Sequence, residues 1–166
     1  MTRPFLRWPD RRLQTAAAPV TEITDEIRAI WAEMVEAMDA MPGYGLAAPQ
    51  LGVMLRLAVV DCSEKRGQAI LLANPEVLHA SVQFRDHEEA SPNLPGVAAV
   101  ISRSRAVTVR YLNASGTMEE RDFVNLWATS VQHQIDHLNG RMYFDRLSPL
   151  KRKMLLARAE KIARRA

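Results

Sequence analysis

Residues 125–138 read NLWATSVQHQIDHL, and the rest of the chain is organised around this stretch. Its apolar residues recur at helical spacing, which predicts a helix from about Asn125 to Leu138 that ends near Asn139-Gly140. One face of this helix carries Val124, Trp127, Val131, Ile135 and Leu138, and a different face carries Ser130, His133 and His137. The stretch therefore predicts a helix that packs on one side and presents two imidazoles on another.

The segments on both sides of this helix define the fold class. Before it, Thr24 is an N-cap candidate for a helix that runs to Pro42-Gly43. Short strand-like runs follow, at Leu57–Val60, Ala69–Ala73, Val82–Phe84, Ala106–Leu112 and Met118–Phe123, the last two joined by a turn at Asn113–Gly116. After it, Ser148-Pro149 begins a third helix, with Leu155, Leu156, Ala159, Ile162 and Ala163 on its apolar side. Helices separated by a block of short strands indicate an α+β domain.

Length and composition limit the class of protein. The 166 residues, 48% hydrophobic and 25% charged, suit a single globular domain spanning 1–166. No apolar run approaches the ~20 residues of a membrane span, and the N-terminus lacks the apolar segment of a secretory signal. The single Cys62 fits a reducing compartment. We expect a cytoplasmic protein that binds neither membrane nor DNA, and the sequence indicates no oligomeric state.

The net charge of +3 is unevenly distributed. Residues 151–166 hold seven basic side chains against one acid, Glu160, which leaves the first 150 residues slightly acidic. The basic residues of the predicted helix at 150–166 include Lys153, Arg158, Lys161, Arg164 and Arg165. Such a tail is either a solvated helix face or a surface for nucleic-acid phosphates.

Three short motifs could carry chemistry. His133 and His137, at i and i+4, lie on one helix face and could reach one metal ion, although Gln134 stands where a metal-binding H-E-x-x-H helix has its glutamate. The alternative is that both are surface or hydrogen-bonded core residues. Residues 43–50, GYGLAAPQ, suggest a close backbone approach or a simple helix-to-strand link, and residues 89–96, EASPNLPG, alone would pass for an ordinary loop.

Together the three motifs resemble those of the peptide deformylases. The family motif G-x-G-L-A-A-P-Q is intact at residues 43–50, E-G-C-L-S-x-P aligns with Glu89–Pro95, and Q-H-E-x-D-H aligns with Gln132–His137. The similarity extends from Pro9-Asp10 and Leu13 through Asn74-Pro75 to Asp145–Ser148 and Lys151. It implies mixed, mainly antiparallel sheets around the helix that carries H-Q-x-D-H, followed by a C-terminal helix.

The resemblance also implies an activity. Deformylases remove formate from the N-formylmethionine of a new protein, using a divalent iron, nickel or zinc ion held by the cysteine of the second motif and the two histidines of the third. The glutamate of the third motif handles the proton, and the glutamine of the first motif and the N–H after the cysteine stabilise the oxyanion. His133, His137, Gln50 and Gly45 match this pattern.

Three positions depart from it. Ser91 replaces the metal-ligand cysteine, and a hydroxyl is a poor ligand for these metals. Pro92 replaces the oxyanion donor and has no N–H. Gln134 replaces the catalytic glutamate and cannot accept the proton. We expect no tightly bound metal and a strongly impaired deformylase, the alternative being a working amide hydrolase with altered metal ligation or another acyl substrate.

The resemblance places the methionine pocket at Tyr44, Leu126 and Thr129, of which Tyr44 is bulkier and Thr129 more polar than the usual residues. The expected partners are the N-terminus of a nascent peptide and the ribosome, since deformylases of this kind dock beside the exit tunnel by a basic C-terminal helix. The five basic residues named above would then contact RNA phosphates. The alternative is a solvated helix that Leu155 and Ile162 pack against the domain.

Overall fold

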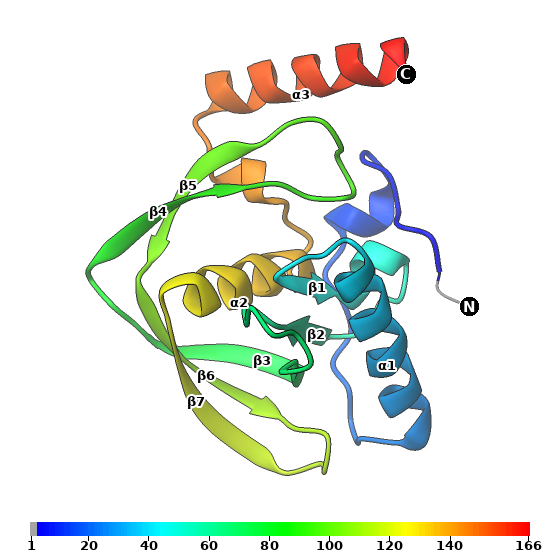
Figure 1. The fold of residues 1–166 in the computed structure, drawn as a ribbon, viewed down its shortest axis with the longest axis vertical. Helices are drawn as coiled ribbons and strands as arrows, with labels where there is room; N and C mark the ends of the chain where they lie inside the picture. The colour runs from blue at the N-terminus through cyan, green and yellow to red at the C-terminus, as the bar shows by residue number, and fades with distance from the viewer. Residues whose placement is uncertain (1–2) are drawn as a thin grey trace.

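The computed structural model describes residues 3–166, in which one helix, α2 (Asn125–Leu138), lies between two antiparallel sheets (Figure 1). The larger sheet has the strand order β1 (Gly45–Ala47), β2 (Leu57–Val60), β3 (Ile70–Ala80), β6 (Ala106–Leu112) and β7 (Met118–Val124). The smaller sheet is the hairpin of β4 (Phe84–Glu89) and β5 (Ala99–Ser104). This arrangement confirms the predicted α+β class, with antiparallel sheets around the histidine-bearing helix.

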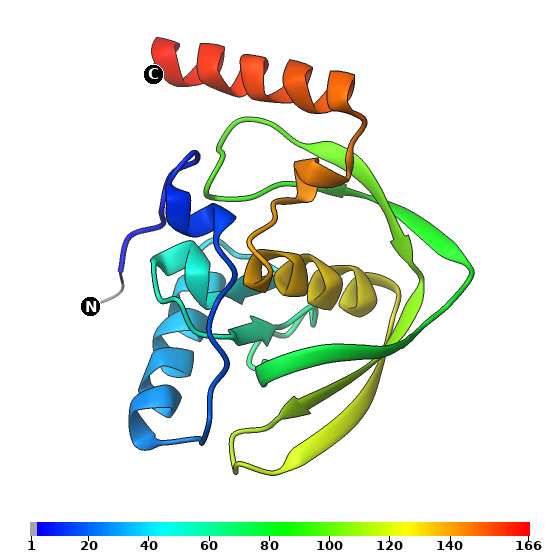
Figure 2. The same ribbon diagram turned by 180° about the vertical axis from the view of Figure 1, so that it is seen from behind.

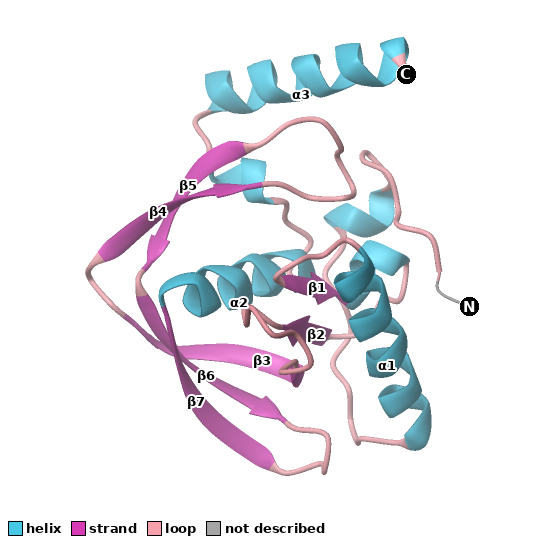
Figure 3. Cartoon of the chain, viewed as in Figure 1, coloured by secondary structure: helices cyan, strands magenta, loops and turns pink. Residues whose placement is uncertain are grey.

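The other two long helices lie on different sides of this assembly, as Figures 2 and 3 show. Helix α1 (Asp25–Ala40) packs against β1 and β2, and α3 (Pro149–Arg165) lies beyond the β4–β5 hairpin. Short 3-10 helices, η1 (Arg11–Gln14), η2 (Ala48–Leu51) and η3 (Tyr143–Arg146), connect the elements. None of the helices within residues 3–166 has both the length and the apolarity to cross a bilayer.

Local sequence sets the ends of the three long helices as predicted. The Thr24 hydroxyl accepts a hydrogen bond from the amide of Ile27, and the Ser148 hydroxyl accepts one from the amide of Lys151. Helix α2 ends at Leu138, and Gly140 follows with φ +76°, a conformation that glycine adopts without strain.

Three apolar clusters hold the layers together. The first packs α2 on the larger sheet through Val109, Phe123 and Val131. The second packs α1 on β1 and β2, with Trp31, Met34 and Met38 fully buried. The third joins η3 and the first half of α3 to the loop after β4. The side of α2 that faces away from the first cluster is thus free to line a site.

Two strand predictions need correction. The strand predicted at Val82–Phe84 instead begins at Phe84 and runs to Glu89, while Val82 lies outside it with 95% of its surface exposed. The partner strand β5 was not predicted at all. Both strands carry charged residues because one face of the hairpin meets solvent and the other forms ion pairs with α2, so neither shows apolar alternation. The strand predicted at Ala69–Ala73 also extends further, to Ala80.

The apolar side of α3 is shorter than predicted. Leu155 and Ala159 are buried and Leu156 is partly buried, but Ile162 and Ala163 are exposed. The second half of α3 therefore stands away from the body, and a cleft of about 1230 Å³ separates it from the N-terminal segment and Pro95. Ile162 still lies against Gly96, where a Cβ would come within 3.0 Å of its side chain.

Candidate functional site

A cleft of about 480 Å³ lies beside α2, between residues 41–45 and the end of β4. The predicted site residues that line it are Tyr44, Gly45, Gln50, Ser91, Pro92, Leu126, Thr129, His133 and Gln134. His137 is buried directly behind this wall, in contact with His133. The five basic residues predicted to bind RNA lie on α3, and no α3 residue lines this cleft. The structure thus brings the three motifs together and keeps the basic helix apart from them.

The two imidazoles contact each other. Nε2 of His133 lies 3.2 Å from Nε2 of His137, and Nδ1 of His133 lies 2.7 Å from Oε1 of Glu89. Because a carboxylate only accepts, His133 donates from Nδ1, and in its neutral form it accepts a hydrogen bond from His137 at Nε2. Burial, together with the neighbouring His133, holds the pKa of His137 well below 6.5 and keeps its ring neutral. Nδ1 of His137 is buried without a hydrogen-bond partner.

A buried ion network fixes the position of His133. Arg103 of β5 donates to both oxygens of Glu89, at 2.6 and 2.9 Å, and to Asp136 at 2.9 Å. Arg146 of η3 pairs with the other side of Asp136. Burial opposes ionisation of Glu89 and Asp136, but these hydrogen bonds and positive charges outweigh it, and the pKa of each carboxyl is lowered. The network therefore orients the His133 ring from behind.

Close backbone approach explains the glycine at position 45. A Cβ on Gly45 would lie 2.6 Å from Nε2 of Gln134 and 2.6 Å from the Ser130 hydroxyl, so a larger residue would displace these two side chains of the cleft wall. The Ser130 hydroxyl donates to the carbonyl of Tyr44, which ties the same two elements. Gln134 is 4% exposed, and its Oε1 is buried without a partner. Its amide forms part of the cleft wall and is not consumed by internal hydrogen bonds.

The second motif is held by its own side chains. The Ser91 hydroxyl donates to Oδ1 of Asn93 at 3.0 Å, and the backbone N–H of Asn93 donates to the same hydroxyl. The side-chain amide of Gln50 also donates to Oδ1 of Asn93, at 2.8 Å, and accepts from the backbone of Ala47. Asn93, which is 1% exposed, donates in turn to the carbonyls of Leu6 and Gln50. These bonds order the loop from within the protein.

The residues present do not fit a tightly held catalytic metal. Two imidazole ligands of a tetrahedral ion lie roughly 3.4 Å apart, so the histidine pair alone would suit one. The third position is the neutral hydroxyl of Ser91, which is engaged with Asn93. Within residues 3–166, no cluster of three histidine, cysteine, aspartate or glutamate side chains is placed to hold an ion. Cys62 does not line the cleft, and burial raises the pKa of its thiol to about 12.

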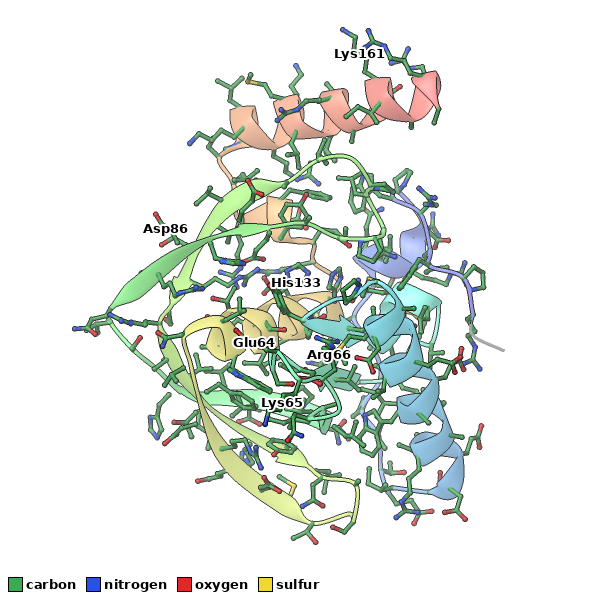
Figure 4. All side chains as sticks on the ribbon, in the orientation of Figure 1. Glu64, Lys65, Arg66, Asp86, His133 and Lys161 are labelled. Atoms are coloured by element: carbon green, nitrogen blue, oxygen red, sulfur yellow. The ribbon has the colours of Figure 1, made fainter. Side chains whose placement is uncertain are left out.

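Several residues of the site were missed by sequence reasoning. Arg103 and Arg146 act through carboxylates of other elements, and no motif marks Arg103 as a polar core residue. Asn93, Glu89 and Asp136 lie inside the aligned motifs, and this was the one available signal. Figure 4 shows His133 in the interior of the molecule, while Asp86, on the opposite face of β4 from Glu89, points to solvent.

The comparisons with known proteins agree with this geometry. The family model for polypeptide deformylase matches residues 2–153. A peptide deformylase of Acinetobacter baumannii is 40% identical over 97% of this chain and 92% of its own length. A peptide deformylase-like protein of Bradyrhizobium diazoefficiens is 41% identical over 98% of this chain and 95% of its own.

Solved structures are similar over the same extent. The crystal structure of a peptide deformylase from Legionella pneumophila has a TM-score of 0.91 and 36% identity, covering 99% of this chain and 96% of that one. The peptide deformylase of Ehrlichia chaffeensis in complex with actinonin has a TM-score of 0.90 and 29% identity, covering 96% of each chain. The similarity thus covers the whole fold and both walls of the cleft.

Proposed function

Because the chain belongs to the polypeptide deformylase family, we propose that it binds the N-terminus of a peptide in the cleft and has little or no deformylase activity. One observation carries the proposal. The third ligand position beside the two histidines is occupied by a neutral hydroxyl, that of Ser91, and this hydroxyl is hydrogen-bonded to Asn93. The atoms that would position a peptide remain, whereas those that would activate water are absent.

The magnitudes favour loss of activity over a modest decrease. A general base contributes about 10²–10⁴-fold, and one oxyanion donor about 10²–10³-fold. Gln134 cannot take up a proton, and Pro92 has no N–H to donate. Without a tightly held metal, the pKa of the attacking water also stays far above ~7. Even with non-additive effects, the three changes together reduce the reaction by several orders of magnitude.

The same residues are suited to binding an amide. The Gln134 side chain is an amide that both donates and accepts, so it can pair with the carbonyl or the N–H of a bound formyl or peptide group. Its Oε1 has no partner within residues 3–166 but is buried, so the side-chain amide would have to rotate to bring that oxygen to a bound N–H. The second N–H of the Gln50 side chain can donate into the cleft, because one N–H suffices for its bond to Asn93. These groups would hold a peptide end without cleaving it.

The test compares the protein with its triple reversion, Ser91→Cys with Pro92→Leu and Gln134→Glu. Hydrolysis of a formyl peptide is measured with each protein in excess iron, nickel and zinc, and binding of the same peptide is measured by calorimetry. We expect binding by both proteins and a hydrolysis rate at least about 10³-fold higher for the reversion. Comparable hydrolysis by the unmodified protein would favour the alternative, a working amide hydrolase with altered metal ligation.

A second proposal concerns the ribosome. The side chains of Lys153, Arg158, Lys161, Arg164 and Arg165 are exposed along α3, and Lys161 points away from the body of the molecule (Figure 4). Glu160 is the one acid of this helix and pairs with Arg164 alone, at 3.2 Å. The positive charge is therefore largely uncompensated, which supports docking on RNA phosphates in the cytoplasm. Peptide binding would then occur close to where nascent chains emerge.

A further inference from the structure

The end of the cleft nearer the start of α2 combines apolar and polar side chains. Thr129 and Leu126 precede His133 by four and seven residues, so they lie about 6 and 10 Å from it along the helix axis. His87 of β4 and Ser130 line the cleft together with them. Thr129 is only 4% exposed, so its hydroxyl is a buried polar group at the inner end of the cleft.

Arg85 of β4 stands behind Thr129. Its Nη1 donates to the Thr129 hydroxyl oxygen at 3.1 Å. Within residues 3–166 this is the one side-chain hydrogen bond of Arg85, and no carboxylate lies within ion-pair distance of its guanidinium. Arg103, directly opposite on β5, is by contrast fully paired with Glu89 and Asp136. The hairpin therefore directs two arginines toward α2, and only the deeper one has its charge compensated.

This pairing determines what the Thr129 hydroxyl can do. Its oxygen accepts from a cation, and its own proton has no acceptor within the described residues. The hydroxyl is thus polarised as a donor toward the cleft. Two acids line the cleft nearby. Glu89 is bonded to Arg103 and His133, while the exposed Glu88 belongs to the face of β4 opposite Glu89. Ser130 uses its proton on the carbonyl of Tyr44.

We propose that this end of the cleft selects a peptide whose first side chain ends in an oxygen acceptor, such as glutamine, glutamate or methionine sulfoxide, over one with a thioether or hydrocarbon end. The proposal rests on the proposed function, since it assumes that a peptide N-terminus occupies the cleft. A hydrocarbon side chain placed here would leave the Thr129 O–H without an acceptor, and burying an unpaired donor is unfavourable.

The experiment measures calorimetric affinities for formyl-X-Ala-Ser peptides in which X is norleucine, methionine, methionine sulfoxide, glutamine or glutamate. We expect the oxygen-bearing side chains to bind about tenfold more tightly than norleucine. The glutamate and glutamine arms distinguish charge from hydrogen bonding. Thr129→Val keeps the shape of the side chain and removes the hydroxyl, and Arg85→Met removes the cation. Each should abolish the preference, and because Thr129→Val removes the donor that a hydrocarbon would leave unpaired, norleucine should bind that variant at least as tightly as it binds the unmodified protein.

Arg110→Met is the matched control. Arg110 is an arginine of β6 whose exposed side chain pairs with Glu76, away from the cleft, so its loss should leave the preference intact. Norleucine binding as well as glutamine, or a preference that persists in both Arg85→Met and Thr129→Val, would overturn the inference while leaving the proposed function standing. Failure of every peptide to bind would overturn both.

Discussion

Replacing Arg103 by methionine tests whether the ion network, rather than a metal, organises the site. The Arg103 side chain is 1% exposed, and it provides two of the three side-chain hydrogen bonds that Glu89 accepts. Methionine fills most of the volume but leaves Oε2 of Glu89 buried without a partner. Asp136 keeps its two bonds from Arg146, so it loses less.

The expected loss of stability follows from the number of hydrogen bonds that Arg103→Met removes. Removing one partner of a buried ion pair destabilises a protein by about 3–5 kcal/mol, because the remaining charge is left unpaired. In a chain of this size that corresponds to a melting temperature about 6–20 °C lower. Arg146→Met provides the comparison, since the Arg146 side chain is 47% exposed whereas that of its partner Asp136 is 8% exposed. We expect it to cost less than Arg103→Met, because Asp136 keeps its bond from Arg103 and water can reach the position that Arg146 leaves.

Urea unfolding at neutral pH, followed by circular dichroism, measures both variants. The double variant Arg103→Met with Glu89→Met should be more stable than the sum of the two single changes predicts, by at least about 1 kcal/mol, because it removes both charges together. A loss below about 1 kcal/mol for Arg103→Met, or strict additivity in the double variant, would refute the view that this pair organises the core of the site.

Three further predictions concern other parts of the molecule. After dialysis against a chelator, the protein should contain well below one equivalent of iron, nickel or zinc by mass spectrometry, and its melting temperature should not change. Asp61→Asn should lower the melting temperature at pH 7, because the Asp61 carboxylate accepts from Ser63 and Gln68 and its pKa is lowered. A carboxyl with a lowered pKa contributes its full stability above the unfolded pKa and loses it as the pH falls through the folded pKa. This difference should therefore begin to shrink near pH ~4 and vanish only below the lowered pKa of Asp61. Co-sedimentation with ribosomes should weaken with a log–log salt slope near −3 if about four residues contact single-stranded RNA, and it should be abolished by reversing four basic residues of α3 to glutamate, Arg158, Lys161, Arg164 and Arg165.

The sequence predicts the helices and the larger sheet because local physics sets them. Caps such as Thr24 and Ser148 form with the expected amides, and β2 and β6 have the predicted bounds. The β4–β5 hairpin escapes prediction because its inner face carries Arg85, Arg103 and Glu89 in place of apolar residues. Such a strand is stable only once α2 supplies the opposite charges and hydrogen-bond acceptors, and that contact is long-range in sequence.

The cleft was predictable to the extent that motifs record it. Gln50, Ser91 and Gln134 come one from each aligned motif, and all three line the same cleft. The partners of these residues were not predictable, because Asn93 is polar in a loop where polar residues are ordinary. That it is 1% exposed and bonded to Ser91 and Gln50 depends on how the loop folds over η2.

The structure separates two tasks that a metal centre usually performs together. Positioning is achieved by Arg103, Glu89 and the hydrogen bonds of Asn93, all of which are protein groups in direct contact. The chemistry would require a thiolate, a backbone N–H and a carboxylate at positions 91, 92 and 134, and the side chains there provide none of these. Because positioning does not depend on the residues at these three positions, the proposed loss of catalysis would leave the cleft preformed. It follows that the triple reversion alters chemistry on an existing framework, and that its effect on hydrolysis should far exceed its effect on peptide affinity.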